Sequence, residues 1–152
     1  MLAPIDKKAV YNAVNAHLDK QIEEIDDLIN RFQEAANGEV KNTAGDKHEV
    51  SKAQMQWEVE KASRQKGNMV NMKRILIRID PSEEHQVIAA GSLVKTDQGF
   101  FYIGVSLGKV TVEHEPVMAM SSVTPLAQLL LGKRKGDEIE FNDKKYVIDS
   151  VH

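Results

Sequence analysis

Cysteine is absent from the 152-residue chain, which excludes disulfide frameworks, thiolate metal sites and cysteine nucleophiles. Aromatic residues make up only 5% of the sequence, too few for an obvious proline-binding pocket. No apolar run approaches the roughly 20 residues that a transmembrane helix needs, and the first ten residues lack the basic and then apolar order of a secretion signal. These absences predict a cytoplasmic protein with no membrane partner.

Neither sign of charge dominates the chain. The 20 basic and 23 acidic residues leave a net charge of -3, which disfavours a nucleic-acid coat protein. There is no Walker loop, no Gly-rich dinucleotide turn and no His-Glu-x-x-His motif. The five histidines are scattered singly, so a metal site built from this chain alone has no support.

The N-terminal segment 5–36 contains neither Gly nor Pro and carries apolar residues at spacings of three and four. This is the stripe of an amphipathic helix. Pro4 suits the first turn, and Asn37-Gly38 predicts the helix end, with residues 37–45 as a loop. The stripe consists of Val14, Leu18, Ile22, Ile25, Ile29 and Phe32.

A second helical pattern runs from Asp46 to about Ile79 and repeats every seven residues, as a two-stranded seam requires. Pro81 ends it, and two long helices joined by a short loop should lie antiparallel as a protruding coiled-coil hairpin of roughly 45 Å. Trp57 is expected to pack against the first helix around Phe32, with a contact to a partner as the alternative. The seam consists of Met55, Ala62, Met69 and Leu76, flanked by Val59, Met72 and Ile79.

The C-terminal half changes composition to short runs rich in Val, Ile, Phe and Tyr, separated by turn residues. These runs predict an antiparallel sheet. Within "TPLAQLLLGKRKGDE" a short helix is expected, with Thr124 as N-cap, Pro125 in the first turn and Gly132 after its end. The predicted fold class is α+β, with a helical hairpin in residues 1–80 and a small sheet domain in residues 81–152.

The stretch "TPLAQLLLGKRKGDEIEF" resembles the C-terminal signature of the Gre family of bacterial transcript cleavage factors, and "GSLVKTDQGFFYI" is similar to the opening strands of the same domain. Together they cover most of residues 88–151. The resemblance implies an FKBP-like domain that docks on bacterial RNA polymerase. Leu130 belongs to the signature, and the residues implied in docking are Thr124, Pro125, Gly132, Lys133, Gly136 and Asp137.

A second resemblance lies between the two predicted helices. Gre factors carry Gly-Asp-x-x-Glu at the end of their hairpin, and residues 45–49, "GDKHE", reproduce that pattern at the matching place. The resemblance implies that the hairpin enters the secondary channel of RNA polymerase and acts indirectly on the 3′ end of the nascent RNA. It further implies a monomer that is not an enzyme by itself but activates the nuclease activity of the polymerase.

Asp46 and Glu49 are three positions apart at a helix start, so they should share one face. The polymerase cuts backtracked RNA with two Mg²⁺ ions, and one tip carboxylate can complete the coordination of the second ion, held jointly with the polymerase. The other can orient or deprotonate the attacking water, and the assignment between the two stays open. The same pair also fits a capping box, a purely structural alternative.

Lys41, Lys47 and Lys52 flank the predicted tip and are candidates for RNA phosphate contacts, or alternatively solvate the hairpin. The sequence departs from the Gre pattern after Glu49, where residues 50–53 read "VSKA" instead of Asn-Ala-Glu-Tyr, and the usual Arg-Pro before the tip is missing. These departures keep open a channel regulator that binds the polymerase without promoting cleavage. A peptidyl-prolyl isomerase or chaperone is a third hypothesis, disfavoured by the few aromatic residues.

Overall fold

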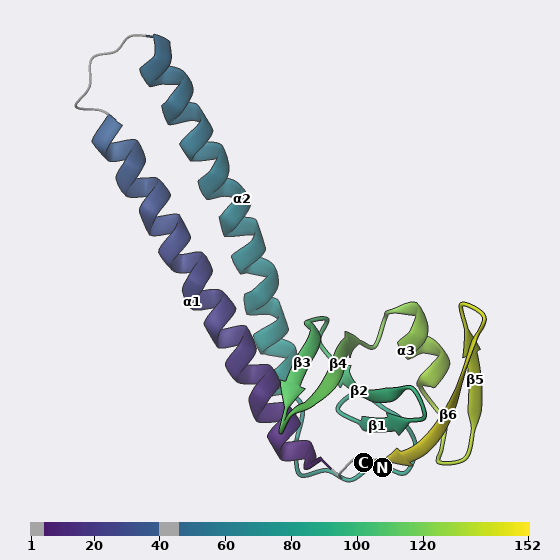
Figure 1. The fold of residues 1–152 in the computed structure, drawn as a ribbon. Helices are drawn as coiled ribbons and strands as arrows, with labels where there is room; N and C mark the ends of the chain where they lie inside the picture. The colour runs from purple at the N-terminus through teal and green to yellow at the C-terminus, as the bar shows by residue number, and fades with distance from the viewer. Residues whose placement is uncertain (1–4, 40–45) are drawn as a thin grey trace. The chain divides into compact units, whose positions relative to one another are not determined.

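The computed structural model describes residues 5–39 and 46–152, with the side chains of residues 5–37 and 51–152. The described residues form two compact units. The hairpin unit contains residues 18–39 and 46–72, and the sheet unit contains residues 5–17 and 73–152. Two long helices followed by strands and one short helix confirm the predicted α+β class (Figure 1). The domain boundary proposed near residue 80 stays a prediction.

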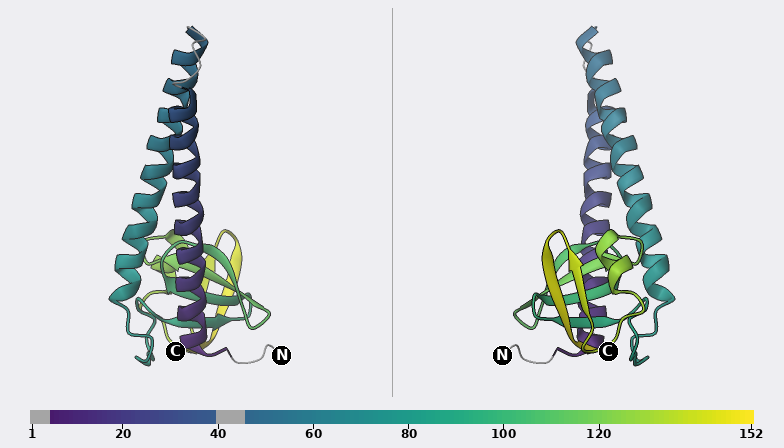
Figure 2. Two further views of the ribbon diagram at one scale, coloured as in Figure 1. Left: turned by 90° about the vertical axis from the view of Figure 1, so that its left-hand side faces the viewer. Right: turned by 90° about the vertical axis from the view of Figure 1, so that its right-hand side faces the viewer.

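The two long helices are α1 (Lys7–Glu39) and α2 (Asp46–Ile77), which lie side by side in Figures 1 and 2. The hairpin unit contains α1 from residue 18 onward and α2 up to residue 72. The predicted seam is confirmed by burial, because Leu18, Ile25 and Ala62 are buried. Lys66 Nζ lies 2.6 Å from Asp26 Oδ1 and joins the two helices through an exposed ion pair, which adds little stability. The half-buried seam residues in this unit are Ile22, Ile29, Phe32, Met55, Val59, Met69 and Met72.

Both helix ends differ from the sequence prediction. Helix α1 continues past Asn37-Gly38 to Glu39, so that pair does not end it. A glycine inside a helix costs only about 1 kcal/mol relative to alanine, which is too little to end a long helix by itself. Helix α2 ends at Ile77, two residues before the predicted end, and Ile79 N donates to Leu76 O at 3.0 Å in a tighter final turn.

Six strands form one sheet in the order β3-β4-β2-β1-β6-β5. Four neighbouring pairs are antiparallel, as predicted, but β2 and β4 are parallel. Because β3 folds back onto β4 as a hairpin, β4 returns to the direction of β2 and lies beside it. The strands are β1 (Leu93–Thr96), β2 (Gly99–Gly104), β3 (Gly108–Val112), β4 (Glu115–Ser121), β5 (Glu138–Phe141) and β6 (Lys144–Val151).

The two faces of β2 are both buried. Phe101 and Ile103 belong to a core that also contains Ala127 and Leu130 of helix α3 (Pro125–Leu130). The alternate residues of the strand, including Tyr102, point to the opposite face and are buried as well. A strand covered on both faces explains the continuous apolar run "GFFYIG".

Two hairpin turns place non-glycine residues in the left-handed region. Asn142 and Asp143 connect β5 to β6 with φ values of 50° and 63°, and Glu113 and His114 connect β3 to β4 with φ values of 51° and 69°. Asn and Asp tolerate this conformation, and the sequence predicted a turn at that pair. Glu113 carries no such preference, and His114 only a modest one, so the sequence signal for their turn is weak.

Candidate functional site

The candidate site predicted from sequence falls where α1 ends and α2 begins. Helix α2 starts at Asp46, so positions 46 and 49 both lie in its first turn. The side chains of Asp46, Lys47 and Glu49 lie outside the described residues, as does Lys41 altogether. The acid pair, its Mg²⁺ and the two lysine contacts therefore stay predictions.

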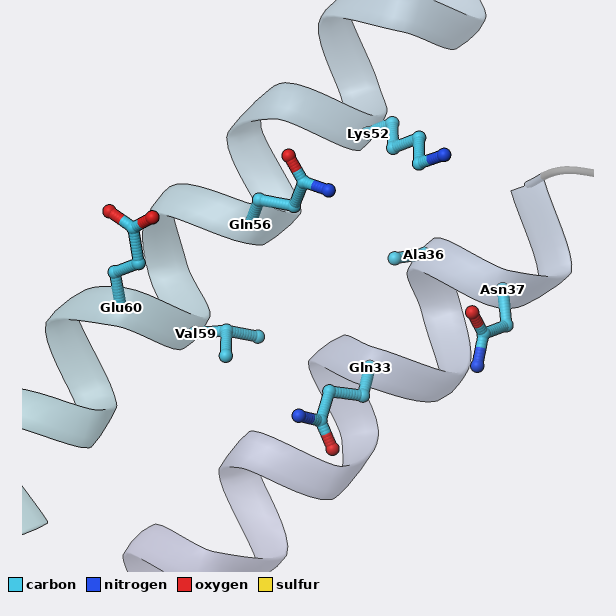
Figure 3. A pocket seen from close by; sticks show the side chains of 7 residues that line it. All are labelled: Gln33, Ala36, Asn37, Lys52, Gln56, Val59 and Glu60. Atoms are coloured by element: carbon cyan, nitrogen blue, oxygen red, sulfur yellow. The ribbon is translucent and has the colours of Figure 1, made fainter.

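A groove of about 620 Å³ lies between α1 and α2 in the part of the hairpin unit closest in sequence to that site (Figure 3). Ala36 and Val59 point into the space between the helices, while the other five lining residues are polar. The apolar seam thus gives way to polar side chains before the helices reach residues 39 and 46. The remaining lining residues are Gln33, Asn37, Lys52, Gln56 and Glu60.

Lys52 is the one of the three candidate lysines whose side chain is described. It is exposed and lines the groove, with its amine on the side of α2 that faces α1 (Figure 3). The position, six residues after Asp46, keeps a cation within two helical turns of the predicted acid pair. A contact between Lys52 and RNA stays a prediction.

Trp57 does not pack against α1 as expected. Its side chain is 53% exposed, and the Lys61 amine lies 5.3 Å from the centre of its ring. Two residues along a helix correspond to roughly 200° of rotation, so Trp57 points away from both Met55 and Val59 of the seam. The heptad pattern alone predicts this direction, because Trp57 lies two positions after Met55 and two positions before Val59.

The signature that resembles the Gre family begins at α3. Thr124 precedes the helix with extended backbone, and Pro125 is its first residue, as predicted. The Thr124 hydroxyl, however, donates to Ser121 O at 2.8 Å and makes no side-chain cap to the helix. Thr124 therefore orients the chain before α3 through a hydrogen bond to a residue three positions earlier.

Gly132 and Lys133 attach the end of α3 to the segment before β1. Gly132 has φ 82° and donates its N–H to Ile88 O at 2.9 Å, while Ile88 N–H donates to Lys133 O at 2.9 Å. A left-handed residue after a helix is typically glycine, because it has no Cβ. The left-handed backbone thus explains why position 132 is a glycine. The Lys133 side chain is exposed.

Gly136 and Asp137 form the turn into β5. Gly136 has φ 93° and donates to Ile148 O at 2.8 Å, and Asp137 Oδ2 accepts from Arg134 N at 2.8 Å. Both residues therefore have a role in the fold that needs no partner. Docking of Thr124, Pro125, Gly132, Lys133, Gly136 and Asp137 on a polymerase stays a prediction.

The sheet unit contains a buried polar cluster that the sequence did not predict. Lys7, in the first turn of α1, donates to Glu83 O, and its Nζ lies 3.2 Å from His85 Nδ1. Ser92 Oγ lies 2.9 Å from the same nitrogen. Burial lowers the pKa of Lys7, while the carboxylate of Glu84 acts in the opposite direction. The cluster ties the loop before β1 to the start of α1.

A cleft of about 280 Å³ lies beside this cluster, within the same unit. Its polar lining includes Arg78, Asp80, Glu83 and His85, and Gly104 contributes to its wall. Among the described side chains no three His, Asp or Glu residues gather as a metal site would require. In the described part of the chain no helix combines the length and apolar character needed to cross a membrane.

No protein-family model matches the chain, and no curated protein matches it. Among solved structures, one titled "Structure of the transcription factor Gfh1" matches over 92% of this chain and 94% of that chain. The sequence identity is 17% and the TM-score is 0.36. The chain is thus coarsely similar to a Gre-like transcription factor over most of its length.

Proposed function

We propose that this protein is a Gre-like secondary-channel factor of bacterial RNA polymerase that stimulates the polymerase's own cleavage of backtracked transcripts. The observation that carries the proposal is the order of its parts. The "GDKHE" motif coincides with the start of α2, the second of the two long helices. It precedes an α+β unit that carries the signature from Thr124 to Asp137.

In this proposal the two acids of the first turn of α2 divide the chemistry. One carboxylate, of Asp46 or Glu49, binds a Mg²⁺ ion jointly with the polymerase, because hard oxygen ligands suit that ion. The other orients or deprotonates the attacking water. The bound ion supplies charge stabilisation to the reacting oxygens. The chain alone is not a nuclease.

The test uses purified protein, bacterial core polymerase and stalled, backtracked elongation complexes. Asp46→Asn and Glu49→Gln should each lower the cleavage rate by about a hundredfold or more, since each removes a charge that the reaction needs. Binding to the polymerase should persist. Glu60→Gln removes a carboxylate elsewhere on α2 and should cleave at the wild-type rate. Absence of cleavage above background at saturating wild-type protein would contradict the proposal.

Glu49→Gln also separates catalysis from helix capping. A capping box accepts Gln in place of Glu, so the helix content measured by circular dichroism should not change. If cleavage is kept in this variant, Glu49 acts as a cap and not as a ligand or base.

A second candidate function is a regulator that binds the polymerase channel without promoting cleavage. It is favoured by residues 50–53, "VSKA", which depart from the Gre pattern immediately after Glu49. This candidate predicts altered transcription by wild-type protein that persists in the Asp46→Asn and Glu49→Gln variants. An effect on transcription that disappears with either acid would exclude it.

A further inference from the structure

We propose that the cleft beside the buried Lys7 cluster binds a free α-amino acid with an apolar side chain. The cleft has a volume of about 280 Å³ and lies within the sheet unit, where the end of α2, the segment before β1 and the ends of β2 and β4 come together. It is called the Arg78 cleft below. The inference goes beyond the proposed function, because it involves neither the hairpin acids nor a polymerase.

Both signs of charge line the Arg78 cleft. Arg78 supplies a guanidinium, and Asp80 and Glu83 supply carboxylates. Among the described residues Arg78 forms no ion pair, so its side-chain donors are available to a ligand. A guanidinium binds a carboxylate through two parallel hydrogen bonds. The carboxylate of an amino acid therefore has a matching partner in this cleft.

The two carboxylates of the lining can bind the ammonium of the same ligand. Asp80 Oδ1 accepts from Ser82 Oγ at 2.6 Å and from Ser82 N at 2.9 Å, which leaves Oδ2 for a ligand. The bond from the Ser82 hydroxyl, followed by that from its N–H, holds the pKa of Asp80 below its usual range. Glu83 Oε1 lies 3.7 Å from His85 Nε2, which is too far for a hydrogen bond. Neither carboxylate is therefore saturated by its neighbours.

The charges around the cleft balance, which favours a zwitterion over an ion of one sign. Beyond the three charged residues of the lining, Glu84 acts on Lys7, and Lys7 and Lys8 act on Asp80. These six groups comprise three cations and three carboxylates. A simple anion would be repelled by the carboxylates and a simple cation by the cations. A ligand with both charges is attracted at both ends.

The apolar part of the lining is suited to an apolar side chain. It consists of Ile75, Ile79, Ala90 and Gly104. Ile79 is held closely, since a Cβ added at Gly91 would lie 2.9 Å from its Cγ2 and one added at Gly104 would lie 3.5 Å from its Cδ1. Ile75 is 49% exposed, so a ligand side chain can remove further apolar surface from water. A surface already held in place costs little ordering when it binds.

The size of the cleft favours a single amino acid over a peptide. Pockets for drug-sized molecules have volumes of roughly 300–1,000 Å³, and this cleft lies just below that range. Arg78 and Asp80 are two positions apart, so their backbones are within about 7 Å of each other. An α-amino acid carries its ammonium and carboxylate on one carbon, whereas the terminal charges of a peptide lie farther apart.

The first experiment titrates the full-length protein with three ligands of one carbon skeleton and follows backbone amide resonances by NMR. L-Leucine should bind with a dissociation constant of about 1 mM or lower and shift the resonances of Ala90 and Gly104. Leucinamide lacks the carboxylate and 4-methylpentanoate lacks the ammonium, so each should bind at least about tenfold more weakly. Absence of saturable leucine binding, or equal binding of all three ligands, would overturn the inference.

Glycine tests the apolar part of the cleft. It carries both charges without a side chain and should bind at least about tenfold more weakly than leucine, because it buries no apolar group. Equal affinity for glycine and leucine would overturn the assignment to apolar amino acids.

The second experiment assigns the two ends of the ligand with two variants. Arg78→Gln should reduce the preference for leucine over leucinamide to within about twofold, and Asp80→Asn should reduce the preference for leucine over 4-methylpentanoate at least about threefold, since Glu83 is retained. A merely structural role would weaken all the ligands alike. If both variants keep the wild-type preferences, the inference fails.

Two control variants change exposed charges of the same unit outside the lining. Arg134→Gln and Asp149→Asn should keep the affinity for leucine within about twofold of wild type. Circular dichroism checks that all four variants keep the wild-type fold. A tenfold loss in either control would overturn the location of the site.

Discussion

The hairpin unit and the sheet unit are stabilised in different ways. In the sheet unit both faces of β2 are buried, and ten buried side chains form one core that includes α3. Among the described side chains of the hairpin unit, three apolar ones are buried, and the rest of its seam is half-buried. Less buried apolar area per residue means a lower free energy of local opening. We therefore expect the hairpin to unfold more easily than the sheet unit.

The chain carries separate optical probes for the two units. Its only tryptophan, Trp57, lies in the hairpin unit, and its three tyrosines, Tyr11, Tyr102 and Tyr146, lie in the sheet unit. Denaturation followed by tryptophan fluorescence and by near-ultraviolet tyrosine signals can thus report on each unit. Non-coincident transitions would confirm the comparison, and one shared transition would refute it.

The largest expected effect comes from truncating one apolar side chain in the sheet core and one in the hairpin seam. Leu130→Ala removes a fully buried side chain and should lower the free energy of unfolding of the sheet unit by about 2–5 kcal/mol. Ile29→Ala removes a half-buried seam residue and should cost the hairpin less, about 1–2 kcal/mol. Urea titrations with both probes measure the two values. Equal losses would show that the hairpin seam is packed as tightly as the sheet core.

A smaller effect is expected from the buried hydroxyl of Tyr102. Among the described residues it has no hydrogen-bond partner, and burial, with Tyr11 as a second cause, raises the pKa of Tyr102. Tyr102→Phe should therefore stabilise the sheet unit by about 1–3 kcal/mol, since it removes an unsatisfied polar group. Tyr11→Phe is the matched control, because the Tyr11 hydroxyl donates to Leu76 O at 2.9 Å. It should destabilise by about 1 kcal/mol, and the same sign for both variants would contradict the assignment.

The smallest expected effect distinguishes two exposed glycines with open space around them. Gly67 lies inside α2, and an added Cβ would meet nothing within 4 Å. Gly67→Ala should stabilise the hairpin by about 1 kcal/mol. Gly132 has equally open surroundings but φ 82°, so Gly132→Ala should destabilise the sheet unit by a similar amount. Thermal unfolding of both variants measures the signs, and a stabilising Gly132→Ala would show that backbone strain is absent there.

The sequence predicted which segments form helices and strands better than it predicted which strands pair with one another. The three- and four-residue spacing in α1 and the seven-residue repeat in α2 correctly identified side chains that are buried or half-buried, because a helix buries residues at its own period. The parallel pairing of β2 with β4 was missed, because strand patterns specify which face is buried and not which strand lies alongside. The left-handed turn at Glu113 and His114 was missed because Glu113 does not favour it and the pair follows directly on a strand-like run.

For the candidate site, too, the sequence predicted the position along the chain better than the side-chain neighbours. The sequence placed Gly45 to Glu49 between two helices, and the structure begins α2 at Asp46. The exposure of Trp57 was predicted wrongly, although its distance of two positions from the seam determined its direction. The polar groove that includes Lys52 could not be predicted, because it depends on which residues of α1 lie opposite those of α2.

The sequence by itself determined the two long helices, the seam between them and the order of helix and sheet, since these follow from apolar periodicity and turn residues close together in the chain. Only the tertiary structure decided the contacts of Lys7 with Glu83 and His85, which are 76 and 78 positions away in the chain. It also decided that the Tyr102 hydroxyl is buried without a partner. Burial and hydrogen bonding between distant segments depend on the completed packing, because neither segment contains the pattern of the other.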